Sequence, residues 1–347
     1  MARRVVLHIG AMKSGTSFIQ NVASANREAL LEQGVLFAGT RWRDQVEAVR
    51  DVAQSSGRGL AEDGPWNTLV REIAAWDQTA LISMEFLAAR TPEEIALICS
   101  SFGDAEITVI VTARDLGRTV PAMWLESTQN GAIETWEEFL DQVRRAEGRA
   151  GRDFHRHQDL PALAERWSAV VGKDNFVIVT VPQPGASPRV LWERFTSVLG
   201  IDGSQADLEV RANLGLGLAS ALVLRRFNEK YLATQGTATP GDPGRDYLRL
   251  VKHRLAKGGL VHREGEPKLG FDTRWGRKMG EQQIKALRAA GYRVVGDLDE
   301  LIPQRVAGVQ PKQVSGQDQL EAALDGLLFL VGDLSERSAR RRGRQQS

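Results

Sequence analysis

The chain has 347 residues, of which 42% are hydrophobic and 26% are charged, a composition typical of a globular protein and not of a disordered or fibrous one. Lys and Arg number 45 and Asp and Glu 44, so the formal net charge is +1. This balance excludes a general electrostatic attraction to nucleic acid or to an anionic membrane, and any anion site must be local.

Four short apolar runs predict buried strands at residues 5–9, 80–84, 107–112 and 176–181. Segments with helical periodicity lie between them, at residues 17–31, 66–76 and 163–171. Strands that alternate with helices at this spacing predict crossover connections. We therefore expect an α/β fold, a three-layer sandwich with a central, mostly parallel sheet.

Helical patterns dominate the later part of the chain, at residues 188–199 and 214–231, and a short strand is predicted at 292–295. The Gly-, Pro- and Thr-rich stretch at 235–244 predicts a loop, and the region up to about residue 275 is equally consistent with a lid over an acceptor site and with an inert surface excursion. We expect one domain over residues 1–305, with a helical or lid insertion at about 205–275. Residues 306–347 are expected to form a helix, at 318–334, and a disordered basic tail around 340–344.

The sequence also bears on the cellular compartment. The single cysteine, Cys99, cannot form a disulfide within the chain, and its apolar neighbours predict a core thiol. The apolar run near the N-terminus is too short for a signal segment, and none reaches the 18 or so residues that span a bilayer. We therefore expect a cytoplasmic protein with no integral membrane segment and no nucleic-acid partner.

The sequence GAMKSGTS, residues 10–17, follows the first predicted strand and precedes a helical pattern. Such a loop points backbone N–H groups and the positive end of the helix at one place, which favours a phosphate or sulfate. Lys13 supplies a charge, and Ser14, Thr16 and Ser17 supply hydroxyl donors. In the P-loop of ATPases a lysine follows the second glycine. Here Thr16 follows Gly15, so the usual triphosphate and magnesium geometry is not encoded.

This loop resembles the 5′-phosphosulfate loop of the sulfotransferase family, and LHIGAMKSGTSFIQ is similar to its bacterial carbohydrate-type members. The resemblance implies a P-loop NTPase-like sulfotransferase fold and 3′-phosphoadenylyl sulfate (PAPS) as co-substrate, which leaves as adenosine 3′,5′-bisphosphate, with no metal. It implies that Lys13, Ser14, Gly15, Thr16 and Ser17 hold the 5′-phosphate and sulfate. The acceptor would be a hydroxyl of a small molecule, glycan or glycolipid, and a homodimer is allowed.

A second family signature, which binds the 3′-phosphate, has an arginine at a strand end and a serine in the next helix. Arg114 matches it, because a guanidinium binds a dianionic phosphate in bidentate geometry. Ser127 lies farther along the chain than the usual serine, so it requires a helix that starts late, near Pro121. A solvent-facing Ser127, with Arg118 as the phosphate ligand in its place, stays open.

Glu85 follows the second predicted strand, at the sheet edge where ligands of α/β proteins bind. Sulfuryl transfer to an alcohol requires a group that accepts the hydroxyl proton, and a partly buried glutamate can do this. The S-x-E pattern ending at Glu85 is similar to one in bacterial sulfotransferases, so we expect Glu85 to act as catalytic base and Lys13 to stabilise charge during an in-line displacement. A glutamate that starts a helix, with a capping role after Ser83, is the alternative.

The histidines compete for the role of base. His8 lies within the first predicted strand and is expected to be a core residue with satisfied hydrogen bonds. His155 and His157 could approach the acceptor, but without nearby Cys or paired carboxylates they do not predict a metal site. Two alternative functions stay open on the sequence: a P-loop kinase or NTPase that uses ATP, and a non-catalytic nucleotide-binding protein of sulfotransferase type.

Overall fold

The computed structural model describes residues 2–55, 59–210, 214–234, 244 and 247–345. Contacts divide the chain into two compact units. Unit 1 comprises Met1–Thr119, Asp153–Asn213 and Arg274–Pro303, and unit 2 comprises Val120–Arg152, Leu214–Thr273 and Gln304–Ser347. Most of the insertion predicted at about 205–275 therefore belongs to unit 2, together with the C-terminal segment.

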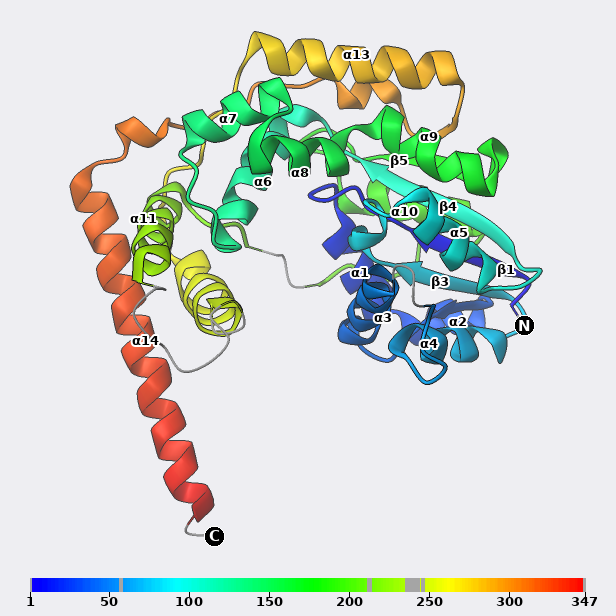
Figure 1. Cartoon of the computed structure of the whole chain (residues 1–347), viewed down its shortest axis with the longest axis horizontal. Helices are drawn as coiled ribbons and strands as arrows, with labels where there is room; N and C mark the ends of the chain where they lie inside the picture. Colours follow the sequence, from blue (N-terminus) through cyan, green and yellow to red (C-terminus); the bar gives the residue numbers. More distant parts are fainter. Residues whose placement is uncertain (1, 56–58, 211–213, 235–243, 245–246, 346–347) are drawn as a thin grey trace. The chain divides into compact units, whose positions relative to one another are not determined.

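Unit 1 contains a six-stranded sheet in which all neighbouring strands are parallel. The strands are β1 (Arg4–His8), β2 (Val35–Phe37), β3 (Thr79–Ser83), β4 (Glu106–Ala113), β5 (Phe176–Thr180) and β6 (Arg293–Val295), in the order β2-β3-β1-β4-β5-β6. Figure 1 labels β1, β3, β4 and β5. The five strands predicted from the sequence are all present. The sequence analysis missed β2, because a run of three apolar residues shows no period that distinguishes it from a loop.

Alternate residues of the strands enter two separate buried clusters. In β1, Val5 and Leu7 belong to the first cluster and Val6 to the second, as side-chain alternation along a strand requires. The first cluster includes residues of α3 (Trp42–Gln54), α4 (Pro65–Ala74), α5 (Pro92–Ser100), α9 (Leu160–Val171) and α13 (Arg274–Ala290), and the second those of α1 (Thr16–Ala25), α2 (Arg27–Glu32) and α10 (Pro188–Leu199). Helices thus cover both faces, and the expected α/β sandwich with a parallel sheet is confirmed in unit 1.

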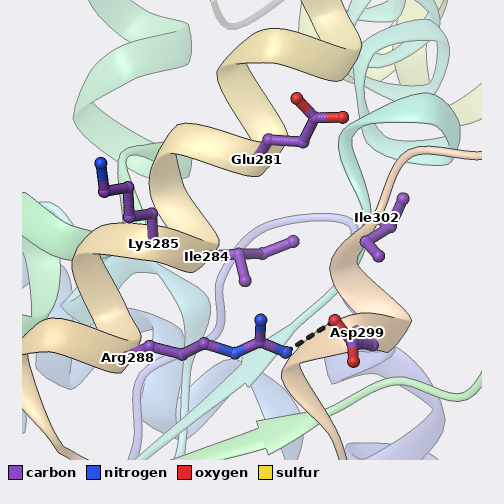
Figure 2. Close-up of a pocket in the computed structure, with 6 residues that line it drawn as sticks. All are labelled: Glu281, Ile284, Lys285, Arg288, Asp299 and Ile302. Carbon is purple, nitrogen blue, oxygen red and sulfur yellow. Dashed lines mark hydrogen bonds and ion pairs between the residues drawn. The ribbon is translucent and has the colours of Figure 1, made fainter.

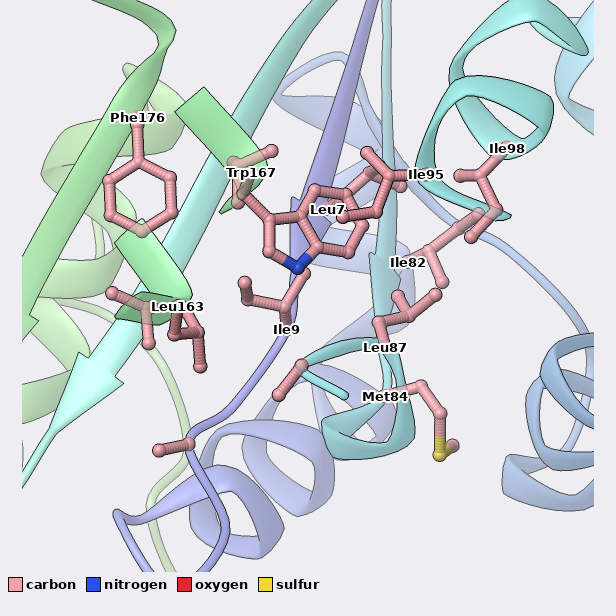
Figure 3. Packing of buried hydrophobic residues seen from close by; sticks show 14 of the residues in the cluster. Leu7, Ile9, Ile82, Met84, Leu87, Ile95, Ile98, Leu163, Trp167 and Phe176 are labelled. Carbon is pink, nitrogen blue, oxygen red and sulfur yellow. The ribbon is translucent and has the colours of Figure 1, made fainter. Parts of the chain in front are cut away.

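Figure 3 shows the centre of the first cluster, where Trp167 of α9 lies among Leu7, Ile9 and Ile82. All four side chains are fully buried. Truncation of a buried tryptophan of this kind typically costs about 3–5 kcal/mol. This core holds β1 between β3 and β4 with His8 in register with Ser83 and Ile110, so the carboxyl ends of the three strands lie side by side.

Two helical predictions need correction. The helix expected at 17–31 is interrupted at Asn26, whose backbone leaves the helical region and whose side chain donates to the carbonyl oxygen of Val22 at 2.8 Å. The tail expected to be disordered is instead the end of α14 (Gly316–Gln345). Nη2 of Arg340, at the start of this segment, lies 3.4 Å from Oε2 of Glu336, an i, i+4 ion pair that stabilises a helix.

The remaining elements are α6 (Leu116–Gln129), α7 (Trp136–Arg145), α8 (Gly148–Gln158), α11 (Leu218–Thr234), the π-helix η3 (Tyr247–Gly259) and the short 3₁₀ turns η1 (Glu85–Leu87), η2 (Lys173–Asn175), η4 (Leu260–His262), η5 (Leu298–Leu301) and η6 (Pro311–Gln313). The predicted loop at 235–244 lies outside the described residues except for Gly244.

Cys99 packs against the first cluster as expected, and burial raises the pKa of its thiol to about 11. Among the described helices, none has the length and apolar character to cross a bilayer.

Candidate functional site

The loop between β1 and α1 ends at Gly15, the N-cap of α1. Gly15 has φ 84°, and a Cβ at this position would lie 2.7 Å from Cδ2 of Leu191, so the turn requires glycine. The first N–H groups of a helix have no partner within the helix, and in the described structure no side chain caps α1. These N–H groups and the helix dipole favour a negative charge at this position.

Two hydroxyl groups of the loop point inward. The Ser14 hydroxyl donates to the carbonyl oxygen of Ala11 and lies 2.9 Å from Oγ1 of Thr112, and the Thr16 hydroxyl donates to the same carbonyl at 3.2 Å. Both side chains are buried, so these hydroxyls shape the loop in this structure. Their predicted contacts with an anion, and that of the partly exposed Ser17, stay predictions.

Lys13 is partly exposed and has φ 61°, in the left-handed region that non-glycine residues rarely adopt. Non-glycine residues held in this region cost about 1–3 kcal/mol and cluster at functional sites. On one side the loop is held by α8, where Nε2 of Gln158 donates to the carbonyl oxygen of Met12 at 2.7 Å. Hydrogen bonds to the loop therefore hold the backbone at Lys13 in a conformation that a lysine rarely adopts.

The end of β4 holds the loop on the other side. The Ala11 N–H donates to the carbonyl oxygen of Thr112 at 2.8 Å, and Nη1 of Arg114 donates to that of Lys13 at 3.1 Å. Burial, with repulsion from Arg118, lowers the pKa of Arg114 to about 10. Nε of Arg114 is buried and has no hydrogen-bond partner in the described structure. Because an unsatisfied buried donor is costly, this nitrogen favours an anion beside the loop.

Glu85 begins η1 directly after β3 and is partly buried. Nε2 of Gln20, on α1, donates to Oε2 of Glu85 at 3.1 Å and to the carbonyl oxygen of Ser83 at 2.8 Å. A Cβ on Gly10 would lie 3.1 Å from Cβ of Glu85, so the carboxylate side chain starts against the first glycine of the loop. Glu85 and the loop that carries Lys13 therefore meet at the carboxyl edge of the sheet.

His8 and Ser83 form a buried pair beneath this edge. Nδ1 of His8 lies 2.7 Å from Oγ of Ser83, and Nε2 lies 3.1 Å from Oγ1 of Thr112. Burial lowers the pKa of His8 to about 3, so the ring is neutral at neutral pH. The expected core histidine is confirmed. Glu85 begins the short turn η1, as the alternative to a catalytic role expected, but in the described structure Met84 is the N-cap with no side-chain cap, and the Ser83 hydroxyl is bonded to His8.

The helix after β4 starts earlier than the sequence analysis required. α6 begins at Leu116 and contains Pro121 within it, so the late start near Pro121 is wrong. Asp115 is buried and accepts the Arg118 N–H at 3.0 Å, as an N-cap residue does. An Asp three residues ahead of this N–H was the sequence signal for the helix start, and it was overlooked.

Arg118 and Ser127, the two alternatives predicted to complete a 3′-phosphate site, make different contacts. The Arg118 guanidinium pairs with Asp115 and donates from Nη1 to the carbonyl oxygen of Pro182 at 2.9 Å, so it links α6 to the segment after β5. The Ser127 hydroxyl donates to the carbonyl oxygen of Trp124 at 2.8 Å. Ser127 belongs to unit 2 and Arg114 to unit 1, and a shared phosphate stays a prediction.

One hollow of unit 1 lies apart from these residues. It has a volume of about 250 Å³ and is lined by α13 and the segment around η5. Figure 2 shows its charged side chains, among which Nη2 of Arg288 lies 2.6 Å from Oδ1 of Asp299. Both partners are about half exposed, and such pairs contribute little. None of the residues predicted for a site lines this hollow. Elsewhere, the described part of the chain has no group of His, Cys, Asp or Glu side chains that could hold a metal ion.

The chain matches no protein-family model and no curated protein. Among solved structures it is similar to the crystal structure of a sulfotransferase from Alicyclobacillus acidocaldarius. The two chains are 14% identical, the match covers 73% of this chain and 97% of that one, and the TM-score is 0.41. A likeness at this level does not identify a family.

Proposed function

We propose that the protein is a PAPS-dependent sulfotransferase that transfers a sulfuryl group to a hydroxyl of a small-molecule, glycan or glycolipid acceptor. One observation carries the proposal: an uncapped helix N-terminus and a partly buried arginine, Arg114, are joined through the backbone of Lys13, and the buried Nε of Arg114 has no partner among the described residues. This arrangement offers donors to two anionic groups, and PAPS carries a 3′-phosphate in addition to its phosphosulfate.

The donor would bind along the loop. The N–H groups at the start of α1 would hold the 5′-phosphosulfate, and Arg114 would bind the 3′-phosphate through the nitrogens that do not contact Lys13. The magnesium-dependent alternative is disfavoured because Thr16 stands where a P-loop has its lysine, and its hydroxyl is bonded to Ala11.

The reaction would be a single in-line displacement. The acceptor oxygen forms a bond to sulfur as the bond between sulfur and the bridging phosphate oxygen breaks. Glu85 takes the proton from the acceptor hydroxyl, and Lys13 stabilises the negative charge that collects on the bridging oxygen. Gln20 already bonds Oε2 of Glu85, which leaves Oε1 to receive the proton. Positioning and charge stabilisation then supply most of the rate enhancement.

Isothermal titration with adenosine 3′,5′-bisphosphate and, separately, with ATP and Mg²⁺ tests the nucleotide assignment. We expect tight binding of the bisphosphate and weak binding of ATP, and the reverse order would establish a kinase or NTPase instead. Transfer of label from ³⁵S-PAPS to a panel of hydroxylated glycans and small alcohols then tests catalysis. Lys13→Ala should abolish that transfer, whereas bisphosphate binding without transfer to any acceptor would indicate a non-catalytic binding protein.

A further inference from the structure

A pocket of about 310 Å³ lies within unit 1, between α3, the segment that follows η1, and the end of α8. Arg50, Arg90, Asp153, Arg156 and His157 provide its polar lining. Phe86 and several small apolar side chains form the rest. The pocket therefore combines an apolar wall with several charged groups, as sites for polar organic ligands do.

Positive charge is in excess in this lining. Three guanidinium groups face one carboxylate, that of Asp153. Arg90 also pairs with Glu94 at 3.4 Å, which still leaves an excess cation. Burial and repulsion from Arg156 lower the pKa of Arg90, so these two cations already disfavour one another. A bound anion would relieve this repulsion.

His157 adds an unsatisfied polar atom. Its Nδ1 is buried and has no hydrogen-bond partner in the described structure. Burial, with repulsion from Arg156, lowers its pKa to about 4, so the ring is neutral at neutral pH and carries one N–H donor. A neutral imidazole can contribute to an oxyanion site by donating from one of its ring nitrogens.

Two residues that line the pocket are sequence neighbours of residues at the proposed catalytic site. Phe86 directly follows Glu85, and consecutive Cα atoms are about 3.8 Å apart. His157 directly precedes Gln158, which donates to the carbonyl oxygen of Met12, next to Lys13. This chain proximity is the reason to connect the pocket with the acceptor.

We infer that this pocket binds a carboxylate or sulfate group of the acceptor, so that the acceptor is an acidic molecule, such as a uronic-acid or sulfated sugar. Arg50, Arg156 and His157 hold its oxyanion while a hydroxyl of the same molecule reaches Glu85. This inference rests on the proposed function for the identity of the ligand as acceptor. The oxyanion site itself rests only on the lining of the pocket.

Arg50 offers the cleanest variant. Arg90 and Arg156 also donate to backbone carbonyl groups near η1, those of Phe86 at 3.1 Å and Ala89 at 3.0 Å, so their loss would disturb the turn after Glu85. Arg50 is exposed on α3. Arg43→Gln is the matched control, because Arg43 is exposed on the same helix, pairs with Glu47 and does not line the pocket.

Direct calorimetric binding with three matched probes tests the inference: 4-nitrophenyl β-D-glucuronide, the 6-sulfate of 4-nitrophenyl β-D-glucoside, and the neutral glucoside. We expect at least one acidic probe to bind the wild-type protein about tenfold or more tightly than the neutral glucoside. Arg50→Gln should remove most of this preference, and Arg43→Gln should retain it. Equal binding of all three probes, absence of binding by all three, or an unchanged preference in Arg50→Gln would overturn the inference.

The same samples separate this inference from the proposed function. Binding of adenosine 3′,5′-bisphosphate is measured in parallel, and Arg50→Gln should leave it within about twofold. A preference for acidic probes without bisphosphate binding would leave the oxyanion pocket standing and remove the sulfotransferase assignment. Bisphosphate binding without a preference for acidic probes would remove the oxyanion pocket and leave the sulfotransferase assignment standing.

Discussion

Nη1 of Arg114 donates a hydrogen bond to the carbonyl oxygen of Lys13 at 3.1 Å. The residue proposed to bind the 3′-phosphate therefore also holds the backbone of the residue proposed to stabilise the leaving group. Because one guanidinium serves both purposes, occupation of the 3′-phosphate position would also fix the orientation of the loop. A donor that lacks the 3′-phosphate would lose binding and positioning together.

Arg114→Lys should lower the affinity for adenosine 3′,5′-bisphosphate by about tenfold or more, because an ammonium group cannot make the bidentate contact and reach Lys13 as well. Calorimetric titration with the bisphosphate and with AMP measures the effect. The wild-type protein should prefer the bisphosphate, and the variant should largely lose that preference. An equal drop in affinity for both nucleotides would show that Arg114 only supports the loop.

Glu85→Gln should lower the turnover number by about 10²–10⁴-fold, because an amide cannot accept the hydroxyl proton. The side chain keeps its size and its contact distance to Gln20, so bisphosphate affinity should change by less than about twofold. Turnover is followed with ³⁵S-PAPS and an acceptor identified in the panel. A variant that keeps the wild-type rate would rule out Glu85 as the base.

Gln20→Leu should reduce turnover less than the Glu85 variant does, by about tenfold, because it removes a positioning hydrogen bond and not the base itself. The hydrogen bond to the Ser83 carbonyl is lost as well, so a parallel urea unfolding curve is needed. The informative readout is the effect of Gln20→Leu in a Glu85→Gln background, where little further loss of turnover is expected because the base is already gone. A full further tenfold loss there would assign Gln20 a purely structural role.

Gly15→Ala should destabilise the protein more than Gly200→Ala does. Both glycines have positive φ, 84° and 79°, so an alanine at either position costs about 1–2 kcal/mol in backbone strain. At Gly15 the new methyl also meets the buried side chain of Leu191, which adds about 1 kcal/mol or more. No atom lies within 4 Å of the corresponding position at Gly200. Urea unfolding of the two variants measures the difference, and equal losses of stability would contradict the additional cost of the Leu191 contact.

His8 should make stability fall as the pH is lowered. Its pKa is about 3 in the folded protein against an ordinary value of 6.5, so between these values the unfolded chain takes up a proton that the folded protein does not. Above pH 6.5 the group has no effect, and from pH 7 to pH 5 it removes about 2 kcal/mol. His8→Gln, which can still bond Ser83, should lose about 2 kcal/mol less over this interval in urea unfolding, while His157 contributes equally to both proteins.

Local sequence patterns were sufficient to predict five of the six strands of unit 1 and the position of the loop at residues 10–17. Buried parallel strands are continuous apolar runs, and GAMKSGTS between a strand and a helix marks the turn directly, because both depend on residues adjacent in the sequence. The placement of Arg114 and Glu85 at strand ends followed from the same runs, since the carboxyl ends of neighbouring parallel strands share one edge.

The sequence by itself determined the alternation of strands and helices, the position of the glycine-containing loop between the first strand and the first helix, and the place of Lys13 ahead of its second glycine. Only the tertiary structure decided that Gln20 faces Glu85, that Arg118 donates to the carbonyl oxygen of Pro182, and that Arg50, Arg156 and His157 line one pocket. The reason is physical. Hydrophobic periodicity in the sequence indicates which side of a helix or strand is buried. The hydrogen-bond partner of a polar side chain often comes from a distant part of the chain, so it is known only once the chain has folded.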